Sequence, residues 1–276
     1  MKELGKRVLV AIIGGPLILG SSFLGSYYFL FFILIINGLS LWEFYTIYRN
    51  KGVYAYRVLG VGLASFLVLT SYPLPLEIFP ALYFIVIAGI IFRHLKITEP
   101  DASTNTVYTL AGISYITIFL ISLLKLRQEF SAWSGLESHL FAGGWFLLVM
   151  WASIWICDTL AYFGGRLLGK HKLAPHTSPN KTIEGAAFGL IGGVLSFLFI
   201  GHWLLPDLPY VYLWISGFIV GILGQTGDLI ESRFKRDAGV KDTSALIPGH
   251  GGFFDRFDSV IFVSPFFFLL FYFFRP

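Results

Sequence analysis

Residues 248–274, PGHGGFFDRFDSVIFVSPFFFLLFYFF, place charged side chains directly before a long apolar run. Asp255, Arg256 and Asp258 precede the stretch Ser259–Phe274, which has no charged residue. Such a run predicts a membrane-spanning helix, since roughly 20 mainly apolar residues, or somewhat fewer, cross a bilayer. Charges at the end of a membrane helix are costly, so this boundary predicts a functional site.

The composition of the whole chain predicts an integral membrane protein. Of its 276 residues 56% are hydrophobic and 13% are charged, and the mean hydropathy is +0.74. A soluble domain carries about 25% charged residues. Backbone in lipid must satisfy its own hydrogen bonds, and the apolar blocks lack a barrel's period of two, so we expect an all-α, polytopic fold. We expect about nine spans, at Val8–Leu24, Tyr27–Leu41, Val58–Tyr72, Ile78–Phe92, Val107–Leu124, Phe141–Cys157, Ile183–Leu205, Val211–Thr226 and Ser259–Phe274.

The basic residues of the connections predict the orientation of the chain. Alternate connections, counted from the N-terminus, hold 17 of the 20 Lys and Arg residues. Cytoplasmic connections carry such an excess, so we expect the N-terminus in the cytoplasm and the C-terminus on the far side. The first 20 residues begin like a signal peptide but offer no convincing cleavage site, and we expect an uncleaved first helix.

The two parts of the chain differ in the character of their connections. Residues 1–140 have short connections, and we expect about five scaffold spans there, whose many Phe and Tyr face either lipid or a second copy in a homodimer. Residues 141–276 have two long connections rich in Gly, Pro, His and charged residues, and we expect the chemistry there. The single cysteine, Cys157, excludes an internal disulfide and predicts apolar packing.

The first long connection, CDTLAYFGGRLLGKHKLAPHTSPNKTIEG (residues 157–185), predicts an anion site. Asp158 lies at the membrane boundary, where an ionisable residue indicates function. We expect Ser178 to cap the next helix and Pro179 to take its first position, with Lys181 and Thr182 in the first turn. Such a helix N-terminus binds phosphate well. The alternative is a capped helix whose lysines touch lipid head groups.

The second long connection, GQTGDLIESRFKRDAGVKDTSALIPGHGGFFDRFDS (residues 224–259), predicts a metal site. Asp228 and Glu231 share a helix face at a spacing of three, and Asp255 and Asp258 repeat that spacing. Mg²⁺ prefers such oxygen ligands, together with substrate phosphates. The alternative is a salt-bridge network with Arg256 or Lys235. Clustered Lys and Arg beside a cation favour the site and predict a nucleotide or pyrophosphate as ligand.

The same stretch resembles the signature of the bacterial phosphatidate cytidylyltransferases, the CDP-diacylglycerol synthases. That signature is met without departure by Ser232, Lys235, Arg236, Lys241, Asp242, Pro248, His250, Gly251, Gly252, Asp255, Arg256 and Asp258. The resemblance covers roughly residues 155–260, including the first long connection, and before that it rests on hydropathy. It implies a multispan enzyme of the bacterial inner membrane, active on its cytoplasmic side, that converts CTP and phosphatidate to CDP-diacylglycerol and pyrophosphate.

The resemblance also implies roles for individual residues. Asp228 and Asp255 are expected to bind Mg²⁺, with Glu231 and Asp258 as further ligands or partners of the ligands, and a second cation is left open. Phosphate contacts are expected from Lys235, Arg236, Lys241, Arg256, Lys172, Lys181 and Thr182. Asp158 completes the metal site or orients a base, and His250 binds phosphate or shapes its turn. Asp242 joins the catalytic set, and Ser178, Ser232, Gly251 and Gly252 contact substrate.

Other classes of membrane protein share some of these features. A transporter also carries carboxylates at membrane depth, but these charges gather at the cytoplasmic boundary and no inverted repeat is evident. A CDP-alcohol phosphotransferase lacks support because no Asp-Gly followed by Ala-Arg occurs. A polyprenol kinase or a relative using another lipid phosphate stays open. The sequence also leaves open the acyl-chain preference and the preference for CTP or dCTP. No nucleic-acid partner is expected.

Overall fold

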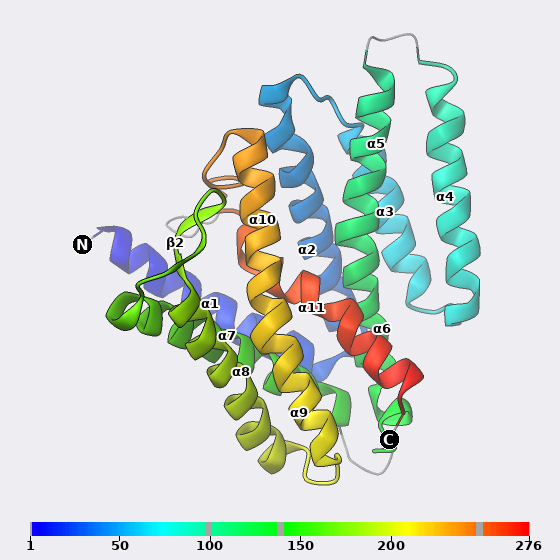
Figure 1. The fold of residues 1–276 in the computed structure, drawn as a ribbon. Helices are drawn as coiled ribbons and strands as arrows, with labels where there is room; N and C mark the ends of the chain where they lie inside the picture. Colours follow the sequence, from blue (N-terminus) through cyan, green and yellow to red (C-terminus); the bar gives the residue numbers. More distant parts are fainter. Residues whose placement is uncertain (1, 98–100, 137–140, 247–250, 276) are drawn as a thin grey trace.

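The computed structural model describes residues 2–97, 101–136, 141–246 and 251–275, and these ranges form a bundle of helices (Figure 1). The helices run in the order α1 (Lys2–Leu24), α2 (Ser26–Ile47), η1 (Tyr48–Lys51), α3 (Arg57–Ser71), η2 (Leu76–Ile78), α4 (Phe79–His94), α5 (Ala102–Gly112), η3 (Ile113–Thr117), α6 (Ile118–Trp133), α7 (Ala142–Leu168), α8 (Ile183–Leu204), α9 (Tyr210–Phe218), η4 (Ile219–Gly224), α10 (Gln225–Ala238) and α11 (Phe254–Phe273). Two short strands, β1 (Lys172–Ala174) and β2 (Ser178–Thr182), form the sheet found in the described ranges. The predicted all-α class is confirmed.

Seven helical stretches are long and apolar enough to cross a membrane. They are Ser26–Lys51, Leu76–His94, Ala102–Trp133, Ala142–Leu168, Ile183–Leu204, Tyr210–Ala238 and Phe254–Phe273. The other two predicted spans are helical but have shorter apolar parts, Ile12–Leu24 and Arg57–Ser71. The count of nine therefore stays a prediction. Large apolar side chains such as Phe84, Phe199 and Trp203 are exposed on the outside, as expected for lipid-facing surface.

The connections between the helices alternate between the two ends of the bundle (Figure 1). The end of α2, the end of α4, the strand hairpin and the end of α10 lie at the upper ends of their elements in Figure 1, whereas the α3–α4 and α8–α9 connections lie at the lower ends of theirs. The segments at the top belong to the basic set of connections in the sequence. This arrangement agrees with the alternation from which the orientation was predicted.

The start of the seventh predicted span differs from the prediction. Ser178 and Pro179 lie in β2, which pairs antiparallel with β1 through Lys172 opposite Thr182. The helix α8 begins only at Ile183, and Thr182 is its N-cap, with its hydroxyl accepting a hydrogen bond from the Gly185 amide at 3.1 Å. The predicted Ser178 cap was wrong because strand pairing holds residues 178–182 extended, which leaves the next hydroxyl to cap the helix.

The helix that carries Asp228 and Glu231 packs closely against α8. A Cβ atom placed on Gly193 of α8 would lie 3.0 Å from the Gly221 backbone in η4, so the two helices touch through their main chains. The η4 segment, Ile219–Gly224, is a π-helical turn within the continuous helix Tyr210–Ala238. Such turns are frequent at functional sites because they rotate the residues that follow. Here those residues are the acidic face of α10.

Aromatic packing ties the N-terminal part of the chain to α10 and α11. The ring of Phe44 in α2 lies 5.5 Å from that of Phe234 and 6.2 Å from that of Phe254, both edge-on. Tyr115 of η3 meets the same two rings at 5.6 and 6.3 Å. Phe44 and Phe254 are buried in the main core, and Tyr115 and Phe234 are partly buried against it. The division into residues 1–140 and 141–276 stays a prediction, but the two parts share one core. Cys157 is buried, as expected.

Candidate active site

A large cavity with one polar and one apolar end lies between α1, α2, α7, α8, α10 and α11. Its volume is about 1320 Å³. The polar end is lined by charged residues of both long connections and their adjoining helices, namely Asp158, Arg166, Lys181, Asp228, Glu231, Lys235, Asp242, Asp255, Arg256 and Asp258. The apolar wall includes Ile13 and Leu17 of α1, Ile35 of α2, and Trp151 and Trp155 of α7. A molecule with a charged head and an apolar body fits such a cavity.

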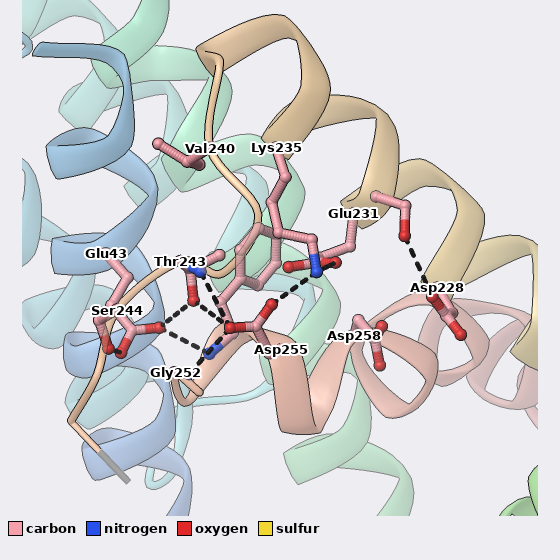
Figure 2. Close-up of polar contacts among 12 residues, drawn as sticks. Glu43, Asp228, Glu231, Lys235, Val240, Thr243, Ser244, Gly252, Asp255 and Asp258 are labelled. Carbon is pink, nitrogen blue, oxygen red and sulfur yellow. Dashed lines mark hydrogen bonds and ion pairs between the residues drawn. The ribbon is translucent and has the colours of Figure 1, made fainter. Parts of the chain in front are cut away.

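Three carboxylates converge at the polar end. Asp228, Glu231 and Asp258 each offer an oxygen within 4.8 Å of the others. Asp228 and Glu231 project from one face of α10, and Asp258 rises toward them from α11 (Figure 2). Glu231 has no exposed surface, and Asp258 is 8% exposed. The predicted shared face of Asp228 and Glu231 is confirmed.

Asp255, the fourth predicted carboxylate, points to a different set of partners. One of its oxygens lies 2.7 Å from Lys235 Nζ, and the other accepts hydrogen bonds from the Gly252 and Thr243 amides at 2.8 and 3.0 Å (Figure 2). Lys235 Nζ also lies 2.6 Å from Glu231. Lys235 therefore bridges Asp255 to the three converging carboxylates. Asp255 as a metal ligand stays a prediction.

The first long connection reaches the same site. Lys181 Nζ lies 2.6 Å from an Asp228 carboxylate oxygen, so the two long connections meet at this ion pair. Asp158 of α7 is exposed and lines the cavity, and Thr182 also lines it. The hairpin itself is held by Glu184, which accepts hydrogen bonds from the Lys170 amide at 3.0 Å and from His171 Nδ1 at 2.6 Å.

Other residues of the predicted site lie around the cavity or outside it. Asp242 and Arg256 line it, and Ser232 donates to Asp228 at 3.3 Å. Lys172, Ser178, Arg236 and Lys241 are not among its lining residues. Arg236 Nε donates instead to the Thr177 carbonyl at 3.2 Å, which ties α10 to the strand hairpin. Gly251 has a positive φ of 80°, and Gly252 approaches Asp255 closely. His250 and Pro248 lie outside the described residues.

One residue at the site was missed in the sequence. Glu43 of α2 is 2% exposed and accepts hydrogen bonds from Thr243 and Ser244 of the second long connection and from the first residues of α11 (Figure 2). It lies two residues beyond the predicted end of the second span, at Leu41, in a helix that continues to Ile47. A lone carboxylate between Trp42 and Phe44 in a membrane helix is the signal that could have found it.

The converging carboxylates fit a hard divalent cation. The three residues supply only oxygen donors, which are the ligands that Mg²⁺ prefers. Lys235 is in an ion pair with Glu231, but neither buried Glu231 oxygen accepts a hydrogen bond of regular geometry from the described residues. A buried carboxylate without such bonds is costly unless something else compensates it. A cation among these three residues would do so.

The fold and the site together define a class. The chain is an integral membrane protein with a carboxylate-rich, lysine-bearing site at the polar end of a large cavity. The model of the cytidylyltransferase family matches residues 5–274, so it covers the N-terminal part as well as the signature. The chain belongs to the cytidylyltransferase family, which confirms the resemblance seen in its sequence.

Curated relatives carry the name phosphatidate cytidylyltransferase. The one from Staphylococcus saprophyticus is 40% identical over 185 residues, which are 67% of this chain and 65% of that protein. The one from Bacillus subtilis is 32% identical over 273 residues, 98% of both chains. The one from Synechocystis is 32% identical over 289 aligned residues, 97% of this chain and 95% of that protein. The alignments span nearly the whole of the Bacillus and Synechocystis relatives and 65% of the Staphylococcus one.

Proposed function

We propose that this chain is a phosphatidate cytidylyltransferase, which makes CDP-diacylglycerol and pyrophosphate from CTP and phosphatidate. The observation that carries the proposal is the two-ended cavity, with Asp228, Lys235 and Arg256 at one end and Leu17 and Trp155 at the other. Phosphatidate has a phosphate head and two acyl chains, and such a cavity accommodates both parts. Family membership and the names of the relatives support the same reaction.

The proposed chemistry is a single displacement at phosphorus. An oxygen of the phosphatidate phosphate forms a bond to the α-phosphorus of CTP. The bond from that phosphorus to the oxygen bridging the β-phosphorus breaks, and its electron pair leaves with pyrophosphate. No protein nucleophile is needed, so the work of the side chains is positioning and charge stabilisation.

The basic residues of the cavity are suited to hold the phosphates. An ammonium has three N–H donors. Glu231 and Asp255 lie 2.6 and 2.7 Å from Lys235 Nζ, which leaves one N–H donor for a phosphate oxygen in the cavity that Lys235 lines. Lys181 and Arg256 line the same end of the cavity and offset charge on the triphosphate. These positions support roles in binding CTP and stabilising the departing pyrophosphate.

Asp228, Glu231 and Asp258 are the residues that would hold Mg²⁺. When bound, the ion supplies positive charge for the phosphoryl oxygens at the reaction centre. Asp158, which faces the same cavity, is a further candidate to contact the ion or its water. In this proposal Asp255 mainly holds the Lys235 ammonium group in position. Its direct contact with the metal stays a prediction.

We place the site at the cytoplasmic face of the bacterial inner membrane. The basic connections support this side, because CTP is a cytoplasmic nucleotide and Lys and Arg accumulate there. The apolar wall of the cavity runs along α1, α2 and α7, so phosphatidate would keep its chains in a lipid-like environment.

The test is pyrophosphate release by the detergent-purified protein, given phosphatidate, CTP and Mg²⁺. The proposal expects release that requires all three and that falls by about 100-fold in an Asp255→Asn variant. The matched control is Asp207→Asn, an exposed carboxylate in the α8–α9 connection, which is expected to behave like the parent. Folded protein that releases nothing with any nucleotide would overturn the proposal.

A further inference from the structure

Glu43 is a buried carboxylate in a membrane helix that makes no ion pair among the described residues. Its two oxygens instead accept hydrogen bonds from Thr243 Oγ1 at 2.9 Å, Ser244 Oγ at 2.6 Å, and the amides of Phe253 and Phe254 at 3.0 and 2.9 Å (Figure 2). Burying an ionised carboxylate is expensive unless it is well hydrogen-bonded. The four donors, from Thr243, Ser244, Phe253 and Phe254, therefore compensate the buried carboxylate and attach this part of the chain to α2.

Two of these donors are the amides that open α11. The first amides of a helix have no partner within the helix, and the helix dipole favours a negative charge beside them. Phe253, at the N-cap position, offers no side-chain acceptor. Glu43, about 210 residues earlier in the chain, supplies the missing acceptor and caps α11 from α2. This cap lies directly before Asp255 and Asp258.

Thr243 connects Glu43 to the charged site. Its hydroxyl oxygen lies 2.9 Å from Glu43 and 2.8 Å from Asp255, while its amide donates to Asp255 at 3.0 Å. The hydroxyl has one proton and so donates to one carboxylate at a time. Asp255 in turn meets Lys235 at 2.7 Å. A contiguous chain of polar contacts thus runs from α2 to the lysine of the cavity.

Gly252 is the residue that lets these groups approach. A Cβ atom there would lie 2.1 Å from Thr243 Oγ1 and 2.4 Å from Glu43 Oε2, far inside van der Waals contact. The close approach of Glu43 and Thr243 therefore explains why position 252 is a glycine. Glu43 itself is not among the residues that line the cavity, and donors occupy its oxygens. It has no room to act on substrate directly.

We propose that Glu43 is a positioning residue: its carboxylate holds Thr243 and the start of α11, and thereby sets Asp255 and Lys235 for phosphoryl transfer. This role rests on the proposed function. It extends the site into the part of the chain that was expected to be scaffold. Residues that orient the groups of a metal or phosphate site typically contribute about 10- to 100-fold to activity.

The experiment compares the parent with Glu43→Gln, which keeps the volume but replaces one acceptor oxygen with a donor. Hydrogen–deuterium exchange of peptides covering residues 251–258 is measured without any substrate. The role predicts faster exchange of the Phe253 and Phe254 amides. Tyr45→Phe is the matched control, because it removes a buried 2.8 Å hydrogen bond to Thr109 from the same helix, away from this segment. It is expected to leave exchange at 251–258 and kcat unchanged.

Kinetics then separate positioning from bulk stability. Glu43→Gln is expected to lower kcat by about 10- to 100-fold, with a change of less than about 3-fold in KM for CTP. In a Thr243→Val background the same substitution is expected to cost much less, because the two residues act through one contact. Fully additive losses, or faster exchange with unchanged kcat, would overturn the positioning role.

A second variant covers the case in which Glu43→Gln does not fold. Ser244→Ala leaves Glu43 and Asp255 intact and removes only one donor to Glu43, and we expect it to lower kcat by about 3-fold and to raise exchange at Phe253. Parent-like exchange and kcat in this variant would count against the role. If the parent itself transfers no cytidylyl group, the proposed function fails, and the exchange data still decide whether Glu43 holds the start of α11.

Discussion

Lys181 and Asp228 form an ion pair of 2.6 Å that joins two connections separated by a whole hairpin of membrane helices. Lys181 lies in β2, one residue before its end, and Asp228 lies in the first turn of α10. The lysine is 27% exposed in its side chain and the aspartate 36%, so a ligand can reach both. In the proposed function, this pair lies where a lysine that binds the triphosphate meets a carboxylate that binds the cation.

Lys181→Met is expected to raise KM for CTP by about 10-fold and to change kcat less, because a cation near phosphate contributes mainly to binding. Lys170→Met is the matched control. Lys170 lies in the same connection, is exposed and does not line the cavity, so its substitution should leave KM as in the parent. Steady-state kinetics with varied CTP test the difference. Equal shifts in both variants would indicate a general loss of basic charge.

Glu231→Gln and Asp258→Asn are each expected to raise the Mg²⁺ concentration for half-maximal activity by about 10-fold or more, because each removes one anionic oxygen from the cluster with Asp228. Asp237→Asn is the control on the same helix, where it pairs with Arg233 at 3.0 Å on the exposed face. Activity is titrated with Mg²⁺ after removal of metal with a chelator. A shift in the control as large as in the other two would contradict the metal assignment.

Gly252→Ala is expected to destabilise the protein by about 1–3 kcal/mol and to abolish most of its activity, because the new Cβ would collide with Thr243 and Glu43. Gly62→Ala in α3 is the comparison, since nothing lies within 4 Å of a Cβ there. That substitution should keep or slightly raise stability, as alanine favours helix. Thermal unfolding in detergent and activity are measured together. A fully active Gly252→Ala variant would show that the segment rearranges freely.

Leu17→Trp is expected to weaken binding of long-chain phosphatidate. Leu17 lines the apolar part of the cavity, and a larger ring would fill space intended for acyl chain. KM for dioleoyl phosphatidate should rise by about 10-fold, while KM for dihexanoyl phosphatidate should change little. Leu69 is an exposed residue of α3 that does not line the cavity, so Leu69→Trp should change the KM of neither lipid. Equal effects on both lipids would place the chains elsewhere.

Hydropathy and basic-residue placement were sufficient to predict the helical class and the general order of spans, because the bilayer permits few alternatives for backbone. They were not sufficient for the helix ends. Ser178 and Pro179 match a helix start, yet the chain continues as a strand to Thr182 because β1 pairs with it. Sequence spacing within one segment does not report a partner that lies ten residues away.

Most residues of the charged site could be predicted from spacing along the chain, but their hydrogen-bond and ion-pair partners could not. Asp255 and Asp258 share the spacing of Asp228 and Glu231, which suggests four equivalent carboxylates. In the structure the Gly252 and Thr243 amides hold one oxygen of Asp255, and its other oxygen pairs with Lys235. Glu43 stands out in the sequence as a lone carboxylate in an apolar helix. Its partners Thr243 and Ser244 lie about 200 residues away along the chain, so the sequence does not show what it contacts.

The central claim is that the chain moves a cytidylyl group onto phosphatidate. The most direct test gives purified protein, phosphatidate and Mg²⁺ either CTP labelled at the α-phosphate or CTP labelled at the γ-phosphate, and follows the label into lipid. The account predicts α-label in the lipid, identified as CDP-diacylglycerol, and γ-label only in pyrophosphate. Label from the γ-phosphate in the lipid would mean a kinase. No label in lipid from either nucleotide, with protein shown to be folded, would contradict the account.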